Sequence, residues 1–316
     1  MRAVRSTGDG VVVVDVEATV PSFVTDPVTV RVGSAGICAS DLKMLPWRLP
    51  ATMGHEFAGV LDDGTVVAVQ PNAPCGTCAL CVSGREHLCP ESNHRIHGVF
   101  SDGGLADAVI VDRSSLVMLA PEVGPDVGAL IEPISVALHA AHQGGLHGDD
   151  PPDRVLVIGG GSIGLAVVTI AHHHGAAVDL VARHPAQREA GEKLGAGASL
   201  AEEYDVVIEC AGSQSALDDA IRRVRPGGTI VVPSSWFDPV EVSTSLLMKE
   251  AHLVMSYVYG HHHGVREFDE AVEILAAHPE LADAMISHRF PLDDAPEAFR
   301  IAGDRAAGAI KVVVQP

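Results

Sequence analysis

A glycine loop in the middle of the chain constrains the fold more than any other feature. Residues 155–158 read Val-Leu-Val-Ile, which is typical of a buried strand, and an apolar helix is expected at residues 163–174. Between them stands a Gly-x-Gly-x-x-Gly motif. Its first glycine permits a tight turn, its second lets the backbone approach a pyrophosphate, and its third lets the helix pack close to the strand. This arrangement predicts a dinucleotide site that includes Gly159, Gly161, Ser162, Ile163 and Gly164.

The pattern of the sequence changes near residue 134. Before it, short β-branched runs separated by Gly, Pro and Asp indicate a β-rich domain. After it, expected strands alternate with expected helices, which predicts a parallel, doubly wound sheet with strands at residues 154–158, 178–182, 204–210 and 229–233. A chain of 316 residues is long enough for two such domains.

The end of the second predicted strand bears on the choice of cofactor. NAD sites usually carry an acidic residue there, which binds the ribose 2′-hydroxyl, whereas this chain reads Ala182-Arg183-His184. The guanidinium of Arg183 can instead pair with a 2′-phosphate, with His184 and Arg188 beside it. The alternatives are a solvated Arg183 with bound NAD, or Asp179 as the acid, although Asp179 falls early in the strand. The sequence favours NADP(H) over NAD(H).

Four cysteines follow one another closely within residues 71–98. Four thiolates at this spacing can surround one tetrahedral Zn²⁺. The segment holds few apolar residues, so a metal would supply the order that a hydrophobic core does not. Disulfides are the alternative, but neighbouring Cys-x-x-Cys pairs in a cytosolic chain are usually reduced. We therefore expect a structural zinc bound by Cys75, Cys78, Cys81 and Cys89.

A second group of candidate ligands is more scattered along the chain. Cys38 and His55 are accompanied by two carboxylates, Glu56 and Glu132. A catalytic zinc takes three protein ligands and keeps a fourth position for water or substrate, which a cysteine, a histidine and a carboxylate would satisfy. Spacing alone does not establish this site, because a lone cysteine or histidine is more often inert.

Composition narrows the partners and the compartment. The formal net charge is −20, with acidic residues spread along the chain, so nucleic acid and anionic membranes are poor partners. Residues 1–14 lack a signal-peptide pattern, and no apolar run reaches the roughly 18 residues of a membrane helix. We expect a cytoplasmic protein that acts on a small molecule. The three-histidine runs at residues 172–174 and 261–263 are expected to be surface histidines.

Together these segments resemble the zinc-containing medium-chain dehydrogenase/reductase family of alcohol dehydrogenases, most closely its sorbitol and threonine dehydrogenase branch. The resemblance covers nearly the whole chain. It implies a GroES-like catalytic domain at residues 1–133 and 268–316, with a Rossmann domain inserted at residues 134–267. The motifs that carry it, in the family's order, are GICASD at 36–41, GHEFAG at 54–59, the four-cysteine segment, EPISVALHA at 132–140 and the glycine loop at 159–164.

The resemblance also implies roles for the scattered ligands. Cys38 and His55 match zinc ligands of the family, and Asp41 matches a carboxylate that orients the histidine. Glu56 matches a carboxylate that binds zinc in some members and only supports the ligands in others. Glu132 matches a glutamate that binds the metal directly or through water. Which of the two glutamates binds zinc here stays open.

The implied reaction is hydride transfer between a nicotinamide cofactor and a secondary alcohol or polyol, or its ketone. Ser40 matches the hydroxyl that carries the alcohol proton away. The resemblance implies two zinc ions per chain, one catalytic and one structural, and a homodimer or homotetramer. The alternatives are a zinc-independent NADPH reductase of the same superfamily and a non-catalytic NADP(H)-binding redox sensor, neither of which needs the Cys38 group.

The chain departs from the family pattern at three places. Lys43 stands where many relatives have a histidine, so the proton relay ends differently or Lys43 binds an anionic substrate. The segment between Asp41 and Gly54 is shorter than usual, which weakens any transfer of substrate by analogy. Arg183 replaces the usual acidic residue, as argued above.

Overall fold

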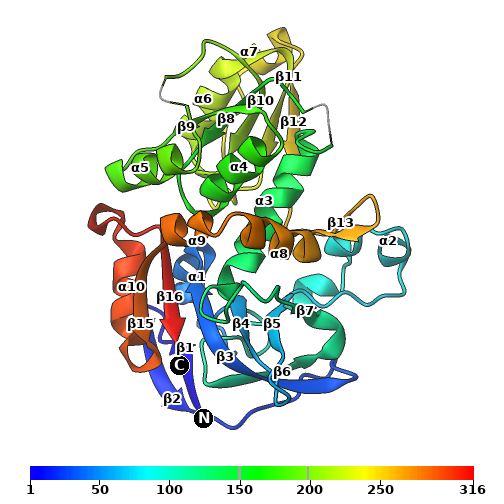
Figure 1. Cartoon of the computed structure of the whole chain (residues 1–316), viewed down its shortest axis with the longest axis vertical. Helices are drawn as coiled ribbons and strands as arrows, with labels where there is room; N and C mark the ends of the chain where they lie inside the picture. The colour runs from blue at the N-terminus through cyan, green and yellow to red at the C-terminus, as the bar shows by residue number, and fades with distance from the viewer. Residues whose placement is uncertain (149–150, 198) are drawn as a thin grey trace. The chain divides into compact units, whose positions relative to one another are not determined.

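The computed structural model describes residues 1–148, 151–197 and 199–316, and Figure 1 shows its helices and strands. The chain forms two compact units. The first comprises Met1–Glu132, His263–Ala277 and Ile286–Pro316, and the second comprises Pro133–His262 and His278–Met285. The first unit thus resumes at His263 and not at residue 268. The segment 278–285 belongs to the second unit because its helix α9 (Glu280–Met285) contacts α4 (Ser162–His173).

Strand β3 (Pro27–Ile37) is the centre of the first unit. It pairs antiparallel with β4 (Glu56–Val60), β6 (Ala108–Asp112) and the C-terminal strand β16 (Lys311–Gln315). The sheet is mixed, because β16 also pairs in parallel with β15 (Ile286–Pro291). The remaining elements of this unit are β1 (Arg2–Ser6), β2 (Val11–Asp15), α1 (Ala39–Met44), β5 (Val66–Val69), α2 (Ala79–Val82), β7 (Leu116–Met118), β14 (Val265–Arg266), α8 (Glu267–Ala277) and α10 (Ala295–Gly303).

The core of the first unit lies between this sheet and α10. Helix α10 buries Ala298, Phe299 and Ala302, which share one helical face at spacings of three and four residues. Strand β16 buries Val312 and Val314 in the same cluster, as the two-residue period of a strand requires. This packing fixes β16 beside β3 and so fixes where the side chain of Lys311 lies.

The second unit contains a five-stranded, fully parallel sheet in the order β12-β11-β10-β8-β9. Strands β9 and β10 flank β8, so the strand order reverses there, and right-handed crossovers place α4 and α6 on opposite faces of the sheet (Figure 1). Ligands of such sheets bind at the carboxyl ends of the strands at this reversal. The strands are β8 (Arg154–Ile158), β9 (Ala177–Val181), β10 (Tyr204–Glu209), β11 (Val224–Val232), β12 (His252–Met255) and the short β13 (His261–His262). The helices are α3 (Ile131–Gln143), which begins in the first unit, α4, α5 (Pro185–Lys193), α6 (Gln214–Arg223), α7 (Thr244–Met248) and α9.

This arrangement is the GroES-like, β-rich domain with an inserted Rossmann sheet that the sequence indicated. Among the described residues, no helix combines the length and apolar character that crossing a lipid bilayer requires.

Candidate active site and cofactor loop

Cys38 and His55 meet at one end of the β3–β4 pair. β3 ends at Ile37, so Cys38 is the N-cap of α1, while His55 directly precedes β4. Because Gly36 pairs with Glu56 in the antiparallel register, the residues just beyond each strand lie at the same edge. The ligand atoms of Cys38, His55 and Glu56 all lie within 4.8 Å of one another.

Asp41 contacts the backbone of Cys38 and the ring of His55. Its Oδ2 accepts a 2.9 Å hydrogen bond from the backbone N–H of Cys38, and its Oδ1 lies 3.2 Å from Nδ1 of His55. Burial alone would lower the pKa of His55, but the Asp41 carboxylate and the Cys38 sulfur raise it well above its usual range. With Nδ1 facing Asp41, the other ring nitrogen, Nε2, is the atom available to a metal, and Ser40 Oγ lies 3.5 Å from it.

Glu56 is held in place by Lys311. Nζ of Lys311 donates to Oε1 and Oε2 of Glu56 at 2.7 and 2.6 Å and to the carbonyl of Ile37 at 3.3 Å. Both side chains are buried, with 3% and 1% exposed. The carboxylate and Coulombic field of Glu56, together with the Cys38 sulfur, raise the pKa of Lys311 although burial alone would lower it. Lys311 is therefore a cation, and its ammonium group donates hydrogen bonds to both carboxylate oxygens of Glu56.

Glu132 brings a further buried carboxyl to the cluster. Burial raises its pKa to about 7, the charges of Glu56 and Asp41 add to the rise, and His55 and Lys311 oppose it. The group thus contains three carboxyls, each at most 8% exposed, and a cysteine, against one lysine and one histidine. Ionising the buried Glu132 carboxyl as well is costly unless a further cation lies beside it. The donor set and the charge balance both fit a Zn²⁺ ion.

The chain around His55 is held by a neighbouring loop. Leu105 and Gly104 donate backbone hydrogen bonds to the carbonyls of Met53 and Gly54, at 2.9 and 2.8 Å. Gly54 adopts φ 94°, in the left-handed region that favours glycine, and Leu105 leaves no room for a Cβ there. These contacts fix the backbone that carries His55.

The four-cysteine segment also converges in space. Sγ of Cys81 lies 3.5 Å from Sγ of Cys78 and 3.9 Å from Sγ of Cys75. Thiolates at about 2.3 Å from a tetrahedral zinc lie about 3.8 Å apart, so these spacings match a zinc–thiolate cage. All six cysteines of the chain lie within the described residues, and none forms a disulfide. The cysteines of this segment are therefore free thiols in the structure and not the disulfide-bonded pairs of the alternative interpretation.

Backbone amides favour thiolates in this cage. Hydrogen bonds from the N–H groups of Thr77 and Cys78 lower the pKa of Cys75 to about 6. Burial and the Cys78 sulfur raise the pKa of Cys81 to about 12, since a second thiolate beside the first is repelled. A divalent cation between the sulfurs removes that repulsion, so the four side chains fit zinc.

The glycine loop has the geometry that its spacing predicted. Gly159 follows β8 with φ 110°, and a Cβ there would lie 2.9 Å from the backbone of Cys210 and Ala211. A Cβ on Gly164 would lie 1.9 Å from the carbonyl oxygen of Gly159, so α4 packs directly on the turn. A Cβ on Gly161, the N-cap of α4, would meet nothing within 4 Å. The space beside Gly161 and the free amides of the first turn fit a pyrophosphate.

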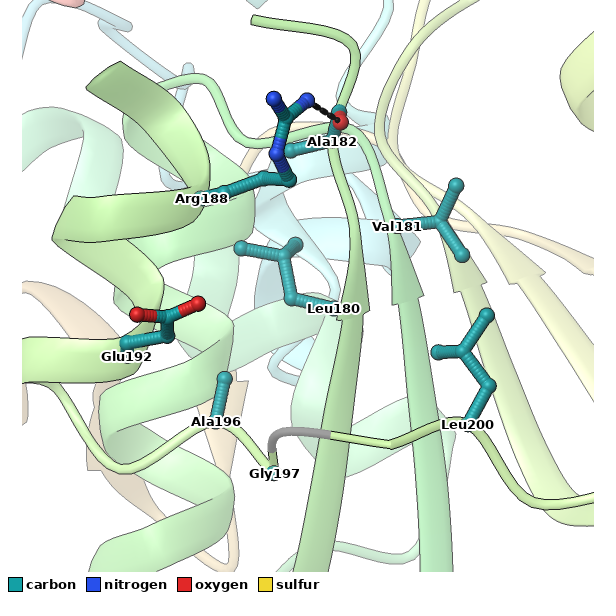
Figure 2. Close-up of a pocket in the computed structure, with 8 residues that line it drawn as sticks. All are labelled: Leu180, Val181, Ala182, Arg188, Glu192, Ala196, Gly197 and Leu200. Carbon is teal, nitrogen blue, oxygen red and sulfur yellow. Dashed lines mark hydrogen bonds between the residues drawn. The ribbon is translucent and has the colours of Figure 1, made fainter. Parts of the chain in front are cut away.

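The residues after β9 form a small structured loop. Arg183 is exposed, and His184 is the N-cap of α5. Nη1 of Arg188 donates to the carbonyl oxygens of Ala182 and Arg183 at 3.0 and 2.8 Å, and Figure 2 shows Arg188 reaching from α5 to Ala182. Arg188 also borders a cavity of about 280 Å³ beside the end of β9.

Asp179, the alternative cofactor-binding residue of this strand, is hydrogen-bonded within the sheet instead. Its Oδ2 accepts a 2.7 Å hydrogen bond from the hydroxyl of Tyr204 and a 3.3 Å bond from the N–H of Ala201. Burial and the Asp179 carboxylate raise the pKa of Tyr204 to about 12. Asp179 therefore ties β9 to β10 and does not stand at the strand's carboxyl end.

Two residues in these sites were not identified from the sequence. Lys311 opens an apolar strand, and a lone lysine before Val-Val-Val is a signal that a buried partner exists. Glu209 ends β10 and is fully buried, where it accepts from the N–H groups of Ala211 and Gly212 and from Ser234 Oγ. It holds the loop beside Gly159. An acidic residue at the end of an apolar strand was the sequence feature from which a buried carboxylate could have been predicted.

Two aromatic side chains of the first unit are largely exposed to solvent. Trp47 is 59% exposed and Phe100 is 49% exposed, whereas Leu45 packs against the core of the first unit.

Comparison with known proteins gives the family. Residues 125–315 match the family described as glucose dehydrogenase C-terminus, and residues 25–122 match the alcohol dehydrogenase GroES-like domain. The chain belongs to the zinc-containing medium-chain dehydrogenase/reductase family. As a member it is an NAD(P)-dependent oxidoreductase of alcohols, and its relatives place it near the sorbitol and threonine dehydrogenase branch.

Individual relatives of this dehydrogenase cover most of its length. It is 28% identical over 305 residues to an L-galactonate-5-dehydrogenase of Escherichia coli strain K12, covering 85% of this chain and 86% of that one. It is 28% identical over 332 residues to an L-threonine 3-dehydrogenase of Saccharopolyspora erythraea, covering 93% of each. A crystal structure described as that of a zinc-binding dehydrogenase from Sinorhizobium meliloti 1021 bound to NADP is 30% identical, with a TM-score of 0.87, and covers 100% of this chain and 99% of that chain.

Proposed function

We propose that this dehydrogenase is zinc-dependent and transfers hydride between NADP(H) and a secondary alcohol or polyol, or its ketone, in the cytoplasm. The observation that carries the zinc requirement is the convergence of Cys38, His55 and Glu56, whose ligand atoms lie within 4.8 Å of one another, with the buried carboxyl of Glu132 interacting electrostatically with His55 and Glu56. A metal-free reductase has no use for such a cluster. A non-catalytic redox sensor has none either, so both alternatives fit the cluster less well.

In this proposal Cys38, His55 and Glu132 bind the catalytic zinc. Glu56 lies beside these ligands and does not bind the metal itself. Lys311 engages both oxygens of Glu56, which favours Glu132 as the carboxylate ligand. The metal, when bound, is a Lewis acid that lowers the pKa of an alcohol oxygen and leaves one position open for substrate. Asp41 keeps His55 in the tautomer whose Nε2 faces that position.

Ser40 is the first group to receive the alcohol proton in this proposal. Its hydroxyl stands beside Nε2 of His55, next to the position that substrate oxygen would take, and a hydroxyl can accept one proton while donating another. Lys43 lies one turn further along α1 and replaces the histidine common in relatives. We assign to Lys43 either the next step of the relay or the binding of an anionic substrate group.

The NADP(H) preference rests on the loop after β9. Asp179 is committed to Tyr204, so no carboxylate is placed for a ribose 2′-hydroxyl, and the exposed guanidinium of Arg183 can meet a 2′-phosphate. The neighbour of known structure from Sinorhizobium meliloti is bound to NADP. Arg188 supports this assignment by holding the carbonyls of Ala182 and Arg183.

The test of the cofactor assignment compares NADPH and NADH binding to wild type, Arg183→Gln and Arg154→Gln. Arg154 begins β8, at the opposite end of the strand from the glycine loop, and so controls for loss of a positive charge. We expect wild type and Arg154→Gln to bind NADPH at least about tenfold more tightly than NADH, about 1.4 kcal/mol, and Arg183→Gln to lose that preference. A wild-type preference for NADH would overturn the assignment and leave the zinc proposal standing.

Metal content separates the enzyme from its two rivals. We expect two zinc ions per chain, with the second held by Cys75, Cys78, Cys81 and Cys89. Cys38→Ser should lose one zinc and its alcohol dehydrogenase activity while still binding NADPH. If wild type and Cys38→Ser both contain one zinc per chain, the proposal of a catalytic zinc is wrong.

A further inference from the structure

Three histidines gather in the second unit, away from both cysteine-containing groups in the sequence. The imidazole rings of His142 and His262 are stacked, with centroids 3.8 Å apart and planes inclined by 17°. The ring of His147 lies 4.6 Å from that of His262 and 6.2 Å from that of His142. Ring nitrogens of His147 and His262 approach within 4.8 Å. All three side chains are partly exposed, so an ion in solution can reach them.

The end of α3 brings two of these histidines together. Gly145 adopts φ 79°, the N–H of Leu146 bonds to the carbonyl of Ala141, and the N–H of Gly145 bonds to the carbonyl of His142. This is the Schellman arrangement that ends a helix and turns the chain back on itself. Buried Leu146 anchors the turn, so His147 returns to the side of His142.

The third histidine comes from a distant part of the sequence. His262 ends β13, more than a hundred residues after α3. Its ring inserts beside both others, so the group is assembled by the tertiary fold and not by local sequence. The run of histidines at 261–263 that looked unremarkable in the sequence therefore contributes one member to a constructed group.

We propose that His142, His147 and His262 form a third metal site, which binds a divalent transition-metal ion such as Zn²⁺. Neutral imidazole nitrogens are preferred ligands of Zn²⁺, Ni²⁺ and Cu²⁺. The C-terminal end of α3 carries partial negative charge, which favours a cation there. The nitrogens of His147 and His262 already converge, rotation of the His142 ring out of its stack on His262 would bring a third nitrogen to the ion, and solvent supplies the remaining ligands. The bound ion ties the end of α3 to β13.

The group also has a chemical reason to prefer a metal over protons. The nitrogen lone pair that binds a metal ion is the one that would otherwise bind a proton, so metal and protons compete for each imidazole. One divalent ion instead satisfies several nitrogens at once and leaves the rings neutral. Metal binding must therefore weaken as the pH falls through the histidine range.

Calorimetric titration with ZnCl₂ tests the proposal, using protein loaded with zinc and then dialysed at about pH 5.5, where a site made of histidines alone releases its ion. The variants are His147→Gln and His262→Gln. The matched control is His173→Gln, which removes a histidine from a separate pair in the same unit, where His173 Nδ1 lies 2.9 Å from His278 Nε2. Titrations at about pH 7.5 and about pH 5.5 bracket the usual histidine pKa. Thermal unfolding without added zinc checks that each variant is folded, and His142→Gln replaces either variant that is not.

We expect wild type and His173→Gln to bind one further Zn²⁺ at the higher pH, and to bind it at least about tenfold more weakly at the lower pH. The His147 and His262 variants should lose at least about tenfold in affinity for this ion. They should keep the zinc already loaded and their affinity for NADPH. The proposal is wrong if wild type takes up no further zinc, or if all four proteins take it up with equal affinity.

Discussion

Lys311 Nζ lies 2.7 and 2.6 Å from the two carboxylate oxygens of Glu56, and neither side chain has appreciable contact with solvent. The pair joins the last strand of the chain to the strand that follows His55. The lysine–carboxylate pairs Lys193–Glu189 and Lys249–Glu203, by contrast, are more exposed to solvent. The position of the Lys311–Glu56 pair next to Cys38 and His55 means that the pairing of β16 with β3 brings Lys311 to this cluster.

Removing one partner of this pair should destabilise the protein strongly. Lys311→Met leaves the Glu56 carboxylate buried without its cation, which typically costs about 3–5 kcal/mol in the free energy of unfolding. Urea unfolding measures this loss. The double variant Lys311→Met/Glu56→Leu removes both charges and should recover much of the stability, whereas an exposed pair such as Arg31–Asp62 should matter by less than about 1 kcal/mol. A loss below about 1 kcal/mol in the single variant would contradict this account.

Asp41→Asn should weaken zinc binding at the catalytic cluster without removing a ligand. The amide cannot keep both the His55 contact at Oδ1 and the Cys38 N–H contact at Oδ2, because one of its two groups is a donor. Loss of such an orienting carboxylate commonly costs about 10–100-fold in metal affinity. Zinc retained against increasing chelator, counted by elemental analysis, gives the affinity. Asp62→Asn is the control, because Asp62 is exposed and forms an ion pair with Arg31 on the surface.

The four-cysteine segment should depend on its metal more than on packing. Cys81→Ser breaks the cage at the sulfur that contacts two others, so residues 71–98 should become open to proteases while the parallel sheet keeps its fold. Limited proteolysis followed by mass spectrometry locates the cuts. Cys210→Ser, which alters a cysteine at the end of β10, should leave the digestion pattern of this segment unchanged. Identical patterns for both variants and wild type would show that the segment is ordered without zinc.

Asp102 should contribute stability that disappears in acid. Burial alone would raise its pKa, but hydrogen bonds from Thr52 and Thr19 and the charge of Arg5 hold its pKa below the ordinary range. A carboxyl with a depressed pKa in the folded state stabilises above its unfolded pKa, about 4, and this contribution is lost as the pH falls below that value. Asp102→Asn should therefore cost about 2 kcal/mol near neutral pH and progressively less below about pH 4. Denaturant unfolding across this range measures the difference, and a difference independent of pH would contradict it.

The sequence predicted the parts of this molecule that depend on local chemistry. The glycine loop is recognisable because each glycine answers a local steric demand, seen at Gly159 and Gly164. The four cysteines lie within fifteen residues of one another, so the segment itself brings them together. The parallel order of the second unit follows from alternation along the chain.

The rest depends on contacts between distant segments. Lys311 reaches Glu56 across 255 positions, and nothing near either residue indicates the other. The same holds for His262 beside His142, which needs both the turn after α3 and the position of β13. The return of residues 278–285 to the second unit was also not predictable, since it arises from packing between α9 and α4.

Gly161 and Gly164 lie in the same loop, but an added methyl group should have a different effect at each. A Cβ on Gly164 would lie 1.9 Å from the Gly159 carbonyl oxygen, so Gly164→Ala should force α4 away from β8 and lower the melting temperature of the cofactor-free protein. A Cβ on Gly161 meets no protein atom within 4 Å, so Gly161→Ala should leave that melting temperature nearly unchanged. The new methyl would instead enter the space that a pyrophosphate needs, and NADPH affinity should fall at least about tenfold. Thermal unfolding and NADPH fluorescence titration on the same samples distinguish the two effects. If Gly161→Ala binds NADPH as wild type does, the pyrophosphate does not pass over this turn.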